Sequence, residues 1–198
     1  VEEIAVGTTG DITLYAKFIP DEYDIAYVLN DGTNDGRNPA KYNYDEAVTS
    51  LYPATKDNYD FVDWYIDADF NTTFSGIPVN STGKKTVYAK FTPKTYNITY
   101  ELNNGTNDKD NPNIYTYGKA VTIKGASKTN YQFDGWYLDD KFTNAFSGIT
   151  ATTSGDLTLY AKFTPDKYKI NYELYDGENN TTNPKEYDYE HGVDHFIA

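Results

Sequence analysis

One seven-residue pattern occurs three times in this chain, and its spacing limits the folds available. Leu14-Tyr15-Ala16-Lys17-Phe18-Ile19-Pro20 recurs at 87–93 and again at 159–165, at intervals of 73 and 72 residues. A second pattern, Tyr23-Asp24-Ile25-Ala26-Tyr27, recurs at 96–100 and at 168–172. Self-similarity at a fixed period is the signature of a repeat architecture. The chain is therefore predicted to be a tandem array of repeats of about 72 residues.

The two patterns divide the chain into four parts. We assign 1–20 to the C-terminal strand of a preceding repeat, 21–93 and 94–165 to two complete repeats, and 166–198 to the N-terminal part of a following repeat. The chain begins at Val1 and contains no Met, so we expect a piece of a longer, processed protein. Neither end piece contains a tryptophan strand, so both are expected to fray or to dock on neighbouring units or chains.

Strand patterns dominate each complete repeat. In the second, Tyr96, Ile98 and Tyr100 alternate with polar residues, as in a half-buried strand. Further strands are predicted near 114–117, 120–123, 131–138 and 157–163, and no window has sustained helical spacing. We therefore predict a mostly β fold with little helix, built of small, mostly antiparallel sheets.

The only two tryptophans mark the expected centre of each repeat. Tyr59–Ile66 and Tyr131–Leu138 are near copies, 72 positions apart, and are rich in aromatic residues. Large rings bury the most apolar area per residue. The predicted structural core is Trp64, Trp136, Phe61, Phe133, Tyr65 and Tyr137.

Composition argues against several classes of protein. The net charge is −13, so no basic face is available for nucleic acid, and anionic membranes are disfavoured. No apolar run approaches the ~20 residues that span a bilayer, so membrane insertion is not expected. The chain has no Cys, which rules out disulfides, thiolate metal sites and cysteine nucleophiles.

Two groups of residues could hold a metal ion. The Asn/Asp-rich turns at 31–38, 103–111 and 176–183 offer oxygen ligands for Ca²⁺, but solvated hairpin loops explain them better. His191 and His195 have a spacing that chelates zinc on a helix. The aligned segments 44–54 and 117–126 predict a strand instead, where residues four apart lie ~13 Å from each other. We expect no metal site and no cofactor.

Catalytic residues are not evident. Asp139-Asp140, or Asp67 with Asp69, could suggest glycoside hydrolysis, but a turn after a strand accounts for them better. No Ser or Thr has a recurring partner for nucleophilic catalysis. The chain is therefore expected not to be an enzyme.

The repeated tyrosines Tyr15, Tyr88 and Tyr160 could form a surface stripe that contacts a host protein or glycan. Cross-strand aromatic packing is the alternative, and we favour it because such pairs stabilise sheets.

The order of motifs resembles the Listeria–Bacteroides repeat family, also called the internalin B B-repeat. The resemblance rests on the Tyr-x-Ile-x-Tyr strand, an Asn/Gly turn, Tyr117-Gly118, Phe133-x-Gly135-Trp136-Tyr137, and the closing Leu-Tyr-Ala-Lys-Phe. It implies tandem β-grasp-like modules of bacterial surface proteins, with no catalytic residues to carry over. Asp63 departs from the family's Gly, and Asp45 and Glu190 replace the Gly of the Tyr-Gly step.

Taken together, the repeats and the resemblance predict a structural stalk or spacer of a secreted, cell-surface protein, attached to the cell wall in its full-length form, that supports an adhesive head. The alternative is a repeat module that itself binds a host protein or glycan. Neighbouring repeats are the other expected partners. The short Pro-containing linkers at 19–22, 92–95 and 164–167 predict a semi-rigid rod.

Overall fold

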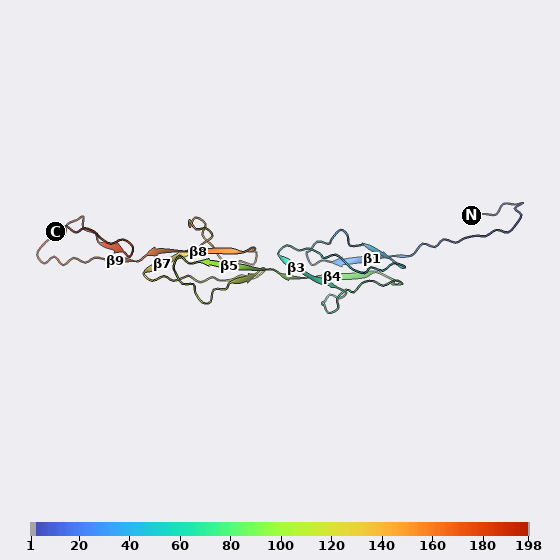
Figure 1. Cartoon of the computed structure of the whole chain (residues 1–198), viewed down its shortest axis with the longest axis horizontal. Helices are drawn as coiled ribbons and strands as arrows, with labels where there is room; N and C mark the ends of the chain where they lie inside the picture. Colours follow the sequence, from blue (N-terminus) through green and yellow to red (C-terminus); the bar gives the residue numbers. More distant parts are fainter. Residues whose placement is uncertain (1–2, 198) are drawn as a thin grey trace. The chain divides into compact units, whose positions relative to one another are not determined.

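A computed structural model of the chain describes residues 3–197 and divides it into two units (Figure 1). Of the described residues, the first unit comprises 3–57 and 61–91, and the second comprises 58–60 and 92–197. All regular structure in the described range is strand: β1 (Glu22–Val28), β2 (Lys41–Asn43), β3 (Tyr59–Tyr65), β4 (Lys85–Pro93), β5 (Thr95–Glu101), β6 (Ile114–Thr116), β7 (Tyr131–Tyr137), β8 (Leu157–Pro165), β9 (Lys167–Lys169) and β10 (Glu186–Asp188).

Each complete repeat forms one four-stranded sheet. The strand orders are β2-β1-β4-β3 and β6-β5-β8-β7, and β9 and β10 form a separate two-stranded sheet. The pairs β1–β2, β5–β6 and β7–β8 are antiparallel, whereas β1–β4 and β5–β8 are parallel. This confirms a mostly β fold of tandem sheets. The parallel pair at the centre of each sheet was not foreseen from the sequence, because strand alternation carries no information on strand direction.

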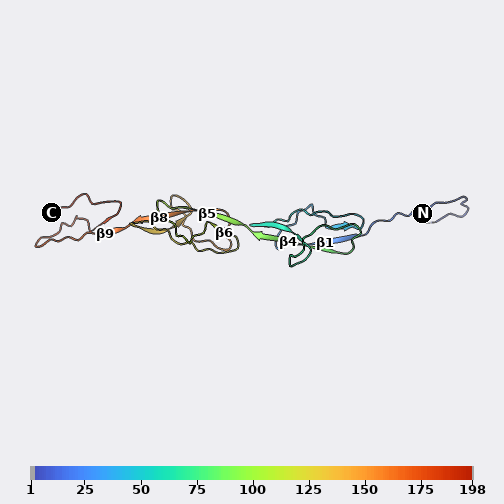
Figure 2. The ribbon, with the colours of Figure 1, turned by 60° about the horizontal axis from the view of Figure 1, so that its bottom comes forward.

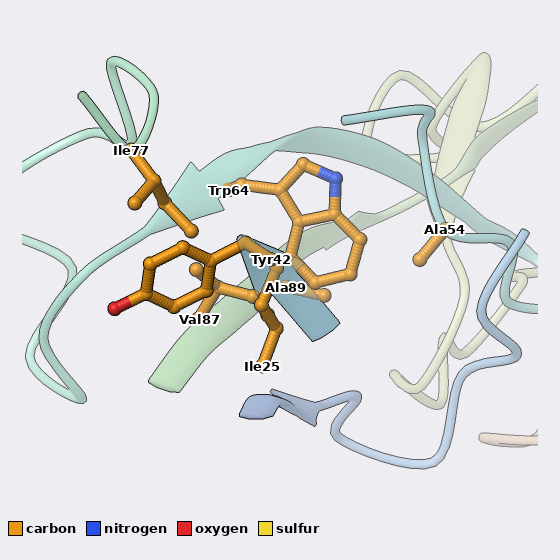
Figure 3. Packing of buried hydrophobic residues seen from close by; sticks show 7 residues of the cluster. All are labelled: Ile25, Tyr42, Ala54, Trp64, Ile77, Val87 and Ala89. Atoms are coloured by element: carbon orange, nitrogen blue, oxygen red, sulfur yellow. The ribbon is translucent and has the colours of Figure 1, made fainter. Parts of the chain in front are cut away.

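Alternation along the central strands places the core. In β4, Val87 and Ala89 are buried while Tyr88 and Lys90 are half-buried, and β8 repeats this with Leu159 and Ala161. The first core also contains Ile25, Tyr42, Ala54, Trp64 and Ile77. Figure 3 shows these side chains gathered together, with the hydroxyl of Tyr42 pointing out of the cluster. That hydroxyl donates to the carbonyl of Gly83 at 2.6 Å, so the ring is buried without an unpaired polar atom.

Two segments that were predicted as strands are irregular. Residues 44–54 and 117–126 hold only isolated bridges, Val48 with Ile77 and Val121 with Ile149. The prediction of a strand at 120–123 was therefore wrong. The strand expected to hold His191 and His195 is absent as well, because residues 190–197 are also irregular.

The joints between repeats are shorter than the predicted four-residue linkers. Pro93 ends β4 and Thr95 begins β5, so only Lys94 lies between them. Asp166 is likewise the only residue between β8 and β9. At 92–95 and 164–167 the flanking residues already belong to strands, because an extended backbone is the conformation that proline favours for the residue before it. In the linker predicted at 19–22, Glu22 alone belongs to a strand.

Residues 3–20 form no strand and lie apart from the sheet of the first unit in both views (Figures 1 and 2). Their apolar side chains are exposed, with Phe18 at 88% and Ile19 at 83%. The same motif forms β4 and β8 where neighbouring strands flank it on both sides. The motif therefore needs those partners to become a strand.

Candidate functional site: the asparagine–tyrosine clasp

A buried asparagine organises the loop after the opening strand of each repeat. The side-chain amide of Asn38 accepts from the Tyr52 N–H at 2.7 Å and donates to the Tyr52 carbonyl at 2.9 Å. Asn111 makes the same pair with Lys124, at 2.7 and 2.9 Å. Each side-chain amide makes the two hydrogen bonds that a residue of a neighbouring strand would make. It thereby satisfies the backbone N–H and carbonyl of a segment that forms no strand.

The tryptophan of each repeat joins this network. Trp64 Nε1 donates to the Tyr52 carbonyl at 2.9 Å, and Trp136 Nε1 donates to the Lys124 carbonyl at 2.9 Å. One carbonyl thus receives both the asparagine amide and the indole. Asn38, Asn111 and Asn183 are the only polar residues classed as buried among residues 3–197. The Asn/Asp-rich turns 31–38, 103–111 and 176–183 were expected to be solvated. That expectation was wrong for the asparagine that ends each turn, because it is buried. The three-fold recurrence of that asparagine was the signal available in the sequence.

A second recurring cluster lies in the second unit, and we call it the clasp. Its first copy comprises Asn58, Tyr59, Lys94, Tyr96 and Tyr117. The Asn58 backbone carbonyl accepts from the Lys94 N–H at 2.9 Å, and its side-chain Oδ1 accepts from the Tyr96 hydroxyl at 2.8 Å. The Tyr59 and Tyr117 rings meet edge to face at 5.6 Å. The backbone carbonyl and the side-chain Oδ1 of one asparagine thus both accept hydrogen bonds, beside an aromatic pair of favourable geometry.

The second copy of the clasp comprises Asn130, Tyr131, Asp166, Tyr168 and Tyr189. The Asn130 carbonyl accepts from the Asp166 N–H at 2.9 Å, and the Tyr168 hydroxyl lies 3.4 Å from Asn130 Oδ1. The Tyr131 and Tyr189 rings meet at 5.6 Å, also edge to face. The Tyr131 hydroxyl also donates to Glu190, and this bond raises the pKa of Tyr131 to about 12.

A left-handed backbone at the asparagine makes both clasps possible. Asn58 has φ 62° and Asn130 has φ 64°. Asparagine enters this region far more readily than most residues with a side chain. The turn lets its carbonyl and its amide reach the same neighbouring hairpin. Asn-Tyr at the start of β3 and of β7 is thus a local signal that the sequence interpretation did not use.

The residues predicted to form the core lie in two environments. Trp64 and Trp136 are buried at 2% and 6% exposure, and Phe61 and Phe133 pack against them as half-buried rings. A bulge between Phe133 and Gly135 brings Phe133 and Trp136 onto the same face, although they are three apart. Tyr65 and Tyr137 instead contact Phe70 and Phe142.

The tyrosines predicted as a possible contact stripe are not equivalent. Tyr88 and Tyr160 are half-buried, whereas Tyr15 is 91% exposed within the unpaired residues 3–20. The lysine of the same motif packs over two rings on that side of the sheet. Lys90 Nζ lies 5.1 Å from the centroid of Tyr65 and 5.4 Å from that of Phe70.

The acidic pairs and the histidines have local partners. Asp139 accepts from the backbone N–H groups of Lys141, Thr143 and Asn144. These bonds, that of Thr143 first, hold the pKa of Asp139 below its usual value. Asp67 closes the equivalent turn in the first repeat. His191 Nδ1 lies 2.8 Å from Asp188. Residues 3–197 contain no cluster of three His, Cys, Asp or Glu side chains able to hold a metal ion.

Comparison with known proteins identifies the repeats. The family model described as the Listeria-Bacteroides repeat domain matches residues 23–90 and 96–162. Two proteins of Evansella cellulosilytica are each 28% identical to this chain, over 85% and 82% of its length. Their names are "Putative membrane protein" and "Putative Gly-rich membrane protein". The chain spans only 25% and 18% of these relatives. No helix within the described residues is long and apolar enough to cross a membrane.

Proposed function

We propose that this chain, which belongs to the Listeria-Bacteroides repeat family, is part of a structural stalk on a bacterial surface protein. The tandem repeats would space a functional head from its attachment to the cell. The names of the two relatives support a location at a membrane or cell surface, although they describe those proteins only.

The clasp is the observation that carries this proposal. A spacer needs joints that resist bending, and here a single residue, Lys94 or Asp166, separates two strands. One backbone hydrogen bond, one side-chain contact and one aromatic pair accompany that residue in each clasp. Such contacts contribute about 0.5–1.5 kcal/mol each, enough in combination to restrict the joint.

A binding role has weaker support. A stripe of equivalent, exposed tyrosines would favour a module that binds a host protein or glycan, but Tyr88 and Tyr160 are half-buried. We therefore treat binding as an outcome of experiment, to be sought with a glycan array and with host surface proteins as bait. The stalk also requires no active site, and we propose that the chain is not an enzyme.

Scattering and spin-label distances on the whole chain test the stalk. A compact domain of this length would have a radius of gyration of about 16 Å, and we expect a value well above it. Because the chain has no Cys, a pair of labels at K84C and T152C reports the distance between the repeats without background. The matched control pair, K119C and D140C, lies within one repeat.

We expect the distance distribution between the repeats to be nearly as narrow as the one within a repeat. Removing the first clasp with Y59A and Y117A should broaden only the distance distribution between the repeats. A compact radius of gyration, or a broad distribution in the parent that the two substitutions leave unchanged, would contradict the stalk.

A further inference from the structure

The surface on which the clasp closes is present three times in the chain. Each opening hairpin stacks two tyrosine rings at 5.4–5.5 Å: Tyr23 on Tyr42, Tyr96 on Tyr115, and Tyr168 on Tyr187. In each, a further tyrosine is fixed by a backbone bond to the residue before the first strand. These bonds are Tyr44 N–H to Asp21 at 2.9 Å, Tyr117 N–H to Lys94 at 2.9 Å, and Tyr189 N–H to Asp166 at 3.0 Å.

Only two of these three surfaces are occupied. Asn58-Tyr59 closes on the second and Asn130-Tyr131 on the third. On the first, neither the Asp21 N–H nor the Tyr23 hydroxyl has a hydrogen-bond partner within residues 3–197. The Tyr117 and Tyr189 rings each meet the ring of a partner tyrosine, whereas the Tyr44 ring pairs with no other ring in residues 3–197. The first surface therefore has the geometry of the other two without the turn that covers them.

We propose that the surface formed by Asp21, Tyr23 and Tyr44 docks the Asn-Tyr turn of another repeat of this family. The Asp21 N–H would donate to the asparagine backbone carbonyl, the Tyr23 hydroxyl to its Oδ1, and the Tyr44 ring would receive the partner tyrosine edge to face. This docking would add a further repeat to the stalk, and it rests on the proposed stalk function.

Charge selects among the possible partners. In the first clasp Lys94 Nζ lies 3.9 Å from Asp60, the residue after the Asn-Tyr pair. In the second clasp the joint residue is Asp166, and the residue after Asn130-Tyr131 is the neutral Gln132. The first surface also has an aspartate, Asp21, at the joint position. Its partner should therefore carry Asn-Tyr-Gln, as at 130–132, because Asn-Tyr-Asp would place two carboxylates together.

An extended chain tests the docking directly. Joining residues 1–165 to a further copy of residues 21–198 places Asn130-Tyr131-Gln132 ahead of a second Asp21, Tyr23 and Tyr44. We expect amide hydrogen exchange, followed by NMR, to resolve two Asp21 signals. The first should exchange as in the parent chain, and the second at least about tenfold more slowly, because its N–H is hydrogen-bonded. The Lys94 and Asp166 amides are the internal standards.

The matched control carries N130A and Y131A in the copy that precedes the second Asp21, and this should return both Asp21 signals to the fast rate. Equal, fast exchange of both amides in the unmodified extended chain, with the strands of all repeats protected, would overturn the proposal. So would an Asp21 that is protected in a dimeric parent chain and stays protected after N130A and Y131A, since a different surface of the second copy would then be the occupant.

A second extended chain tests the selection by charge. Joining residues 1–93 to 21–198 places Asp60 opposite Asp21, and we expect less protection of that Asp21, restored by D60Q. Equal protection with and without D60Q would overturn the charge rule. The docking and the stalk fail separately. A compact scattering profile with a protected Asp21 would overturn the stalk alone, and an extended profile with an unprotected Asp21 would overturn the docking alone.

Discussion

The two complete repeats have the same strand order but differ where their loops meet solvent. In both, a buried asparagine and the tryptophan share one backbone carbonyl at matching distances. At the residue before the tryptophan, where the second repeat has its bulge, Gly135 has φ +131°. The equivalent Asp63 has a negative φ and accepts from the Trp64 N–H at 2.8 Å. The buried network is therefore common to both repeats, whereas the backbone of the residue before the tryptophan differs between them.

The loop charges also differ between the repeats. Arg37 pairs with Asp35 and lies 3.7 Å from the centroid of the Tyr52 ring. In the first repeat the cation thus belongs to the Asn/Asp-rich turn. In the second repeat it belongs to the segment 117–126, where Lys124 pairs with Asp110 and Asp108 of the turn. The same two segments are therefore tied by different chemistry.

Removing a tryptophan should have the largest effect and the same effect in both repeats. W64A or W136A removes a buried ring and an indole hydrogen bond, so we expect a loss of about 3–5 kcal/mol in the free energy of unfolding of that repeat. Denaturation followed by the NMR signals of the substituted repeat measures this loss, and the fluorescence of the remaining tryptophan reports the unchanged repeat as the control. If either substitution shifts its own repeat by under about 1 kcal/mol, the two cores are not equivalent hubs.

Replacing the buried asparagine should come next. N38A or N111A leaves the backbone N–H of Tyr52 or Lys124 without its acceptor and leaves the carbonyl of the same residue with the indole as its one donor. The expected cost is about 2–3 kcal/mol. N38D and N111D keep the shape and lose the amide donor, so they should be no less damaging. Urea unfolding followed by the NMR signals of each repeat measures both, and a neutral N38A beside a damaging N111A would show that the two asparagines are not equivalent.

The bulge should distinguish the two repeats. G135A forces a side chain into a backbone region that L-residues rarely adopt, so we expect a loss of about 1–3 kcal/mol. D63G has no such strain and should cost under about 1 kcal/mol, mainly through added freedom of the unfolded chain. The same unfolding measurement on both variants tests this, and equal losses would mean that Asp63 and Gly135 share one constraint.

The loop charges should have the smallest effects, with a distinct dependence on pH and salt. Arg37 holds the pKa of Asp35 at about 2, so the stability from this pair is present above the usual carboxyl pKa and is lost as pH falls towards 2. R37A should remove that acid dependence. Salt should weaken the contribution of Lys124 more than that of Arg37, which keeps its contact with the Tyr52 ring. Melting curves at two ionic strengths compare R37A with K124A.

The sequence allowed the repeat length, the strand content and the tryptophan hubs to be predicted, because period and aromatic clustering are local properties. The direction of β4 beside β1 could not be, since it depends on a pairing across some 60 residues. The segments 44–54 and 117–126 have apolar residues typical of strands. They stay irregular because the amides of Asn38 and Asn111 provide the pairing that a ladder would give.

The clasp shows a second limit of sequence interpretation. Asn58-Tyr59 and Asn130-Tyr131 recur at the repeat period, but nothing in a single sequence says what a tyrosine ring will meet. The linkers were predicted from proline alone, and the strands in fact continue through them to a single residue. Tertiary contacts, made by side chains from the next hairpin, account for what the local pattern missed.

The parallel pairing of β1 with β4, and of β5 with β8, determines how a pulling force would act on each repeat. The chain enters a complete repeat at one of these strands and leaves it by the other. Tension along the chain therefore drags two adjacent strands past each other along their common axis. The evenly spaced hydrogen bonds of a parallel pair then share the load and must break together. A hairpin, whose bonds would open one at a time from the end, offers no such resistance.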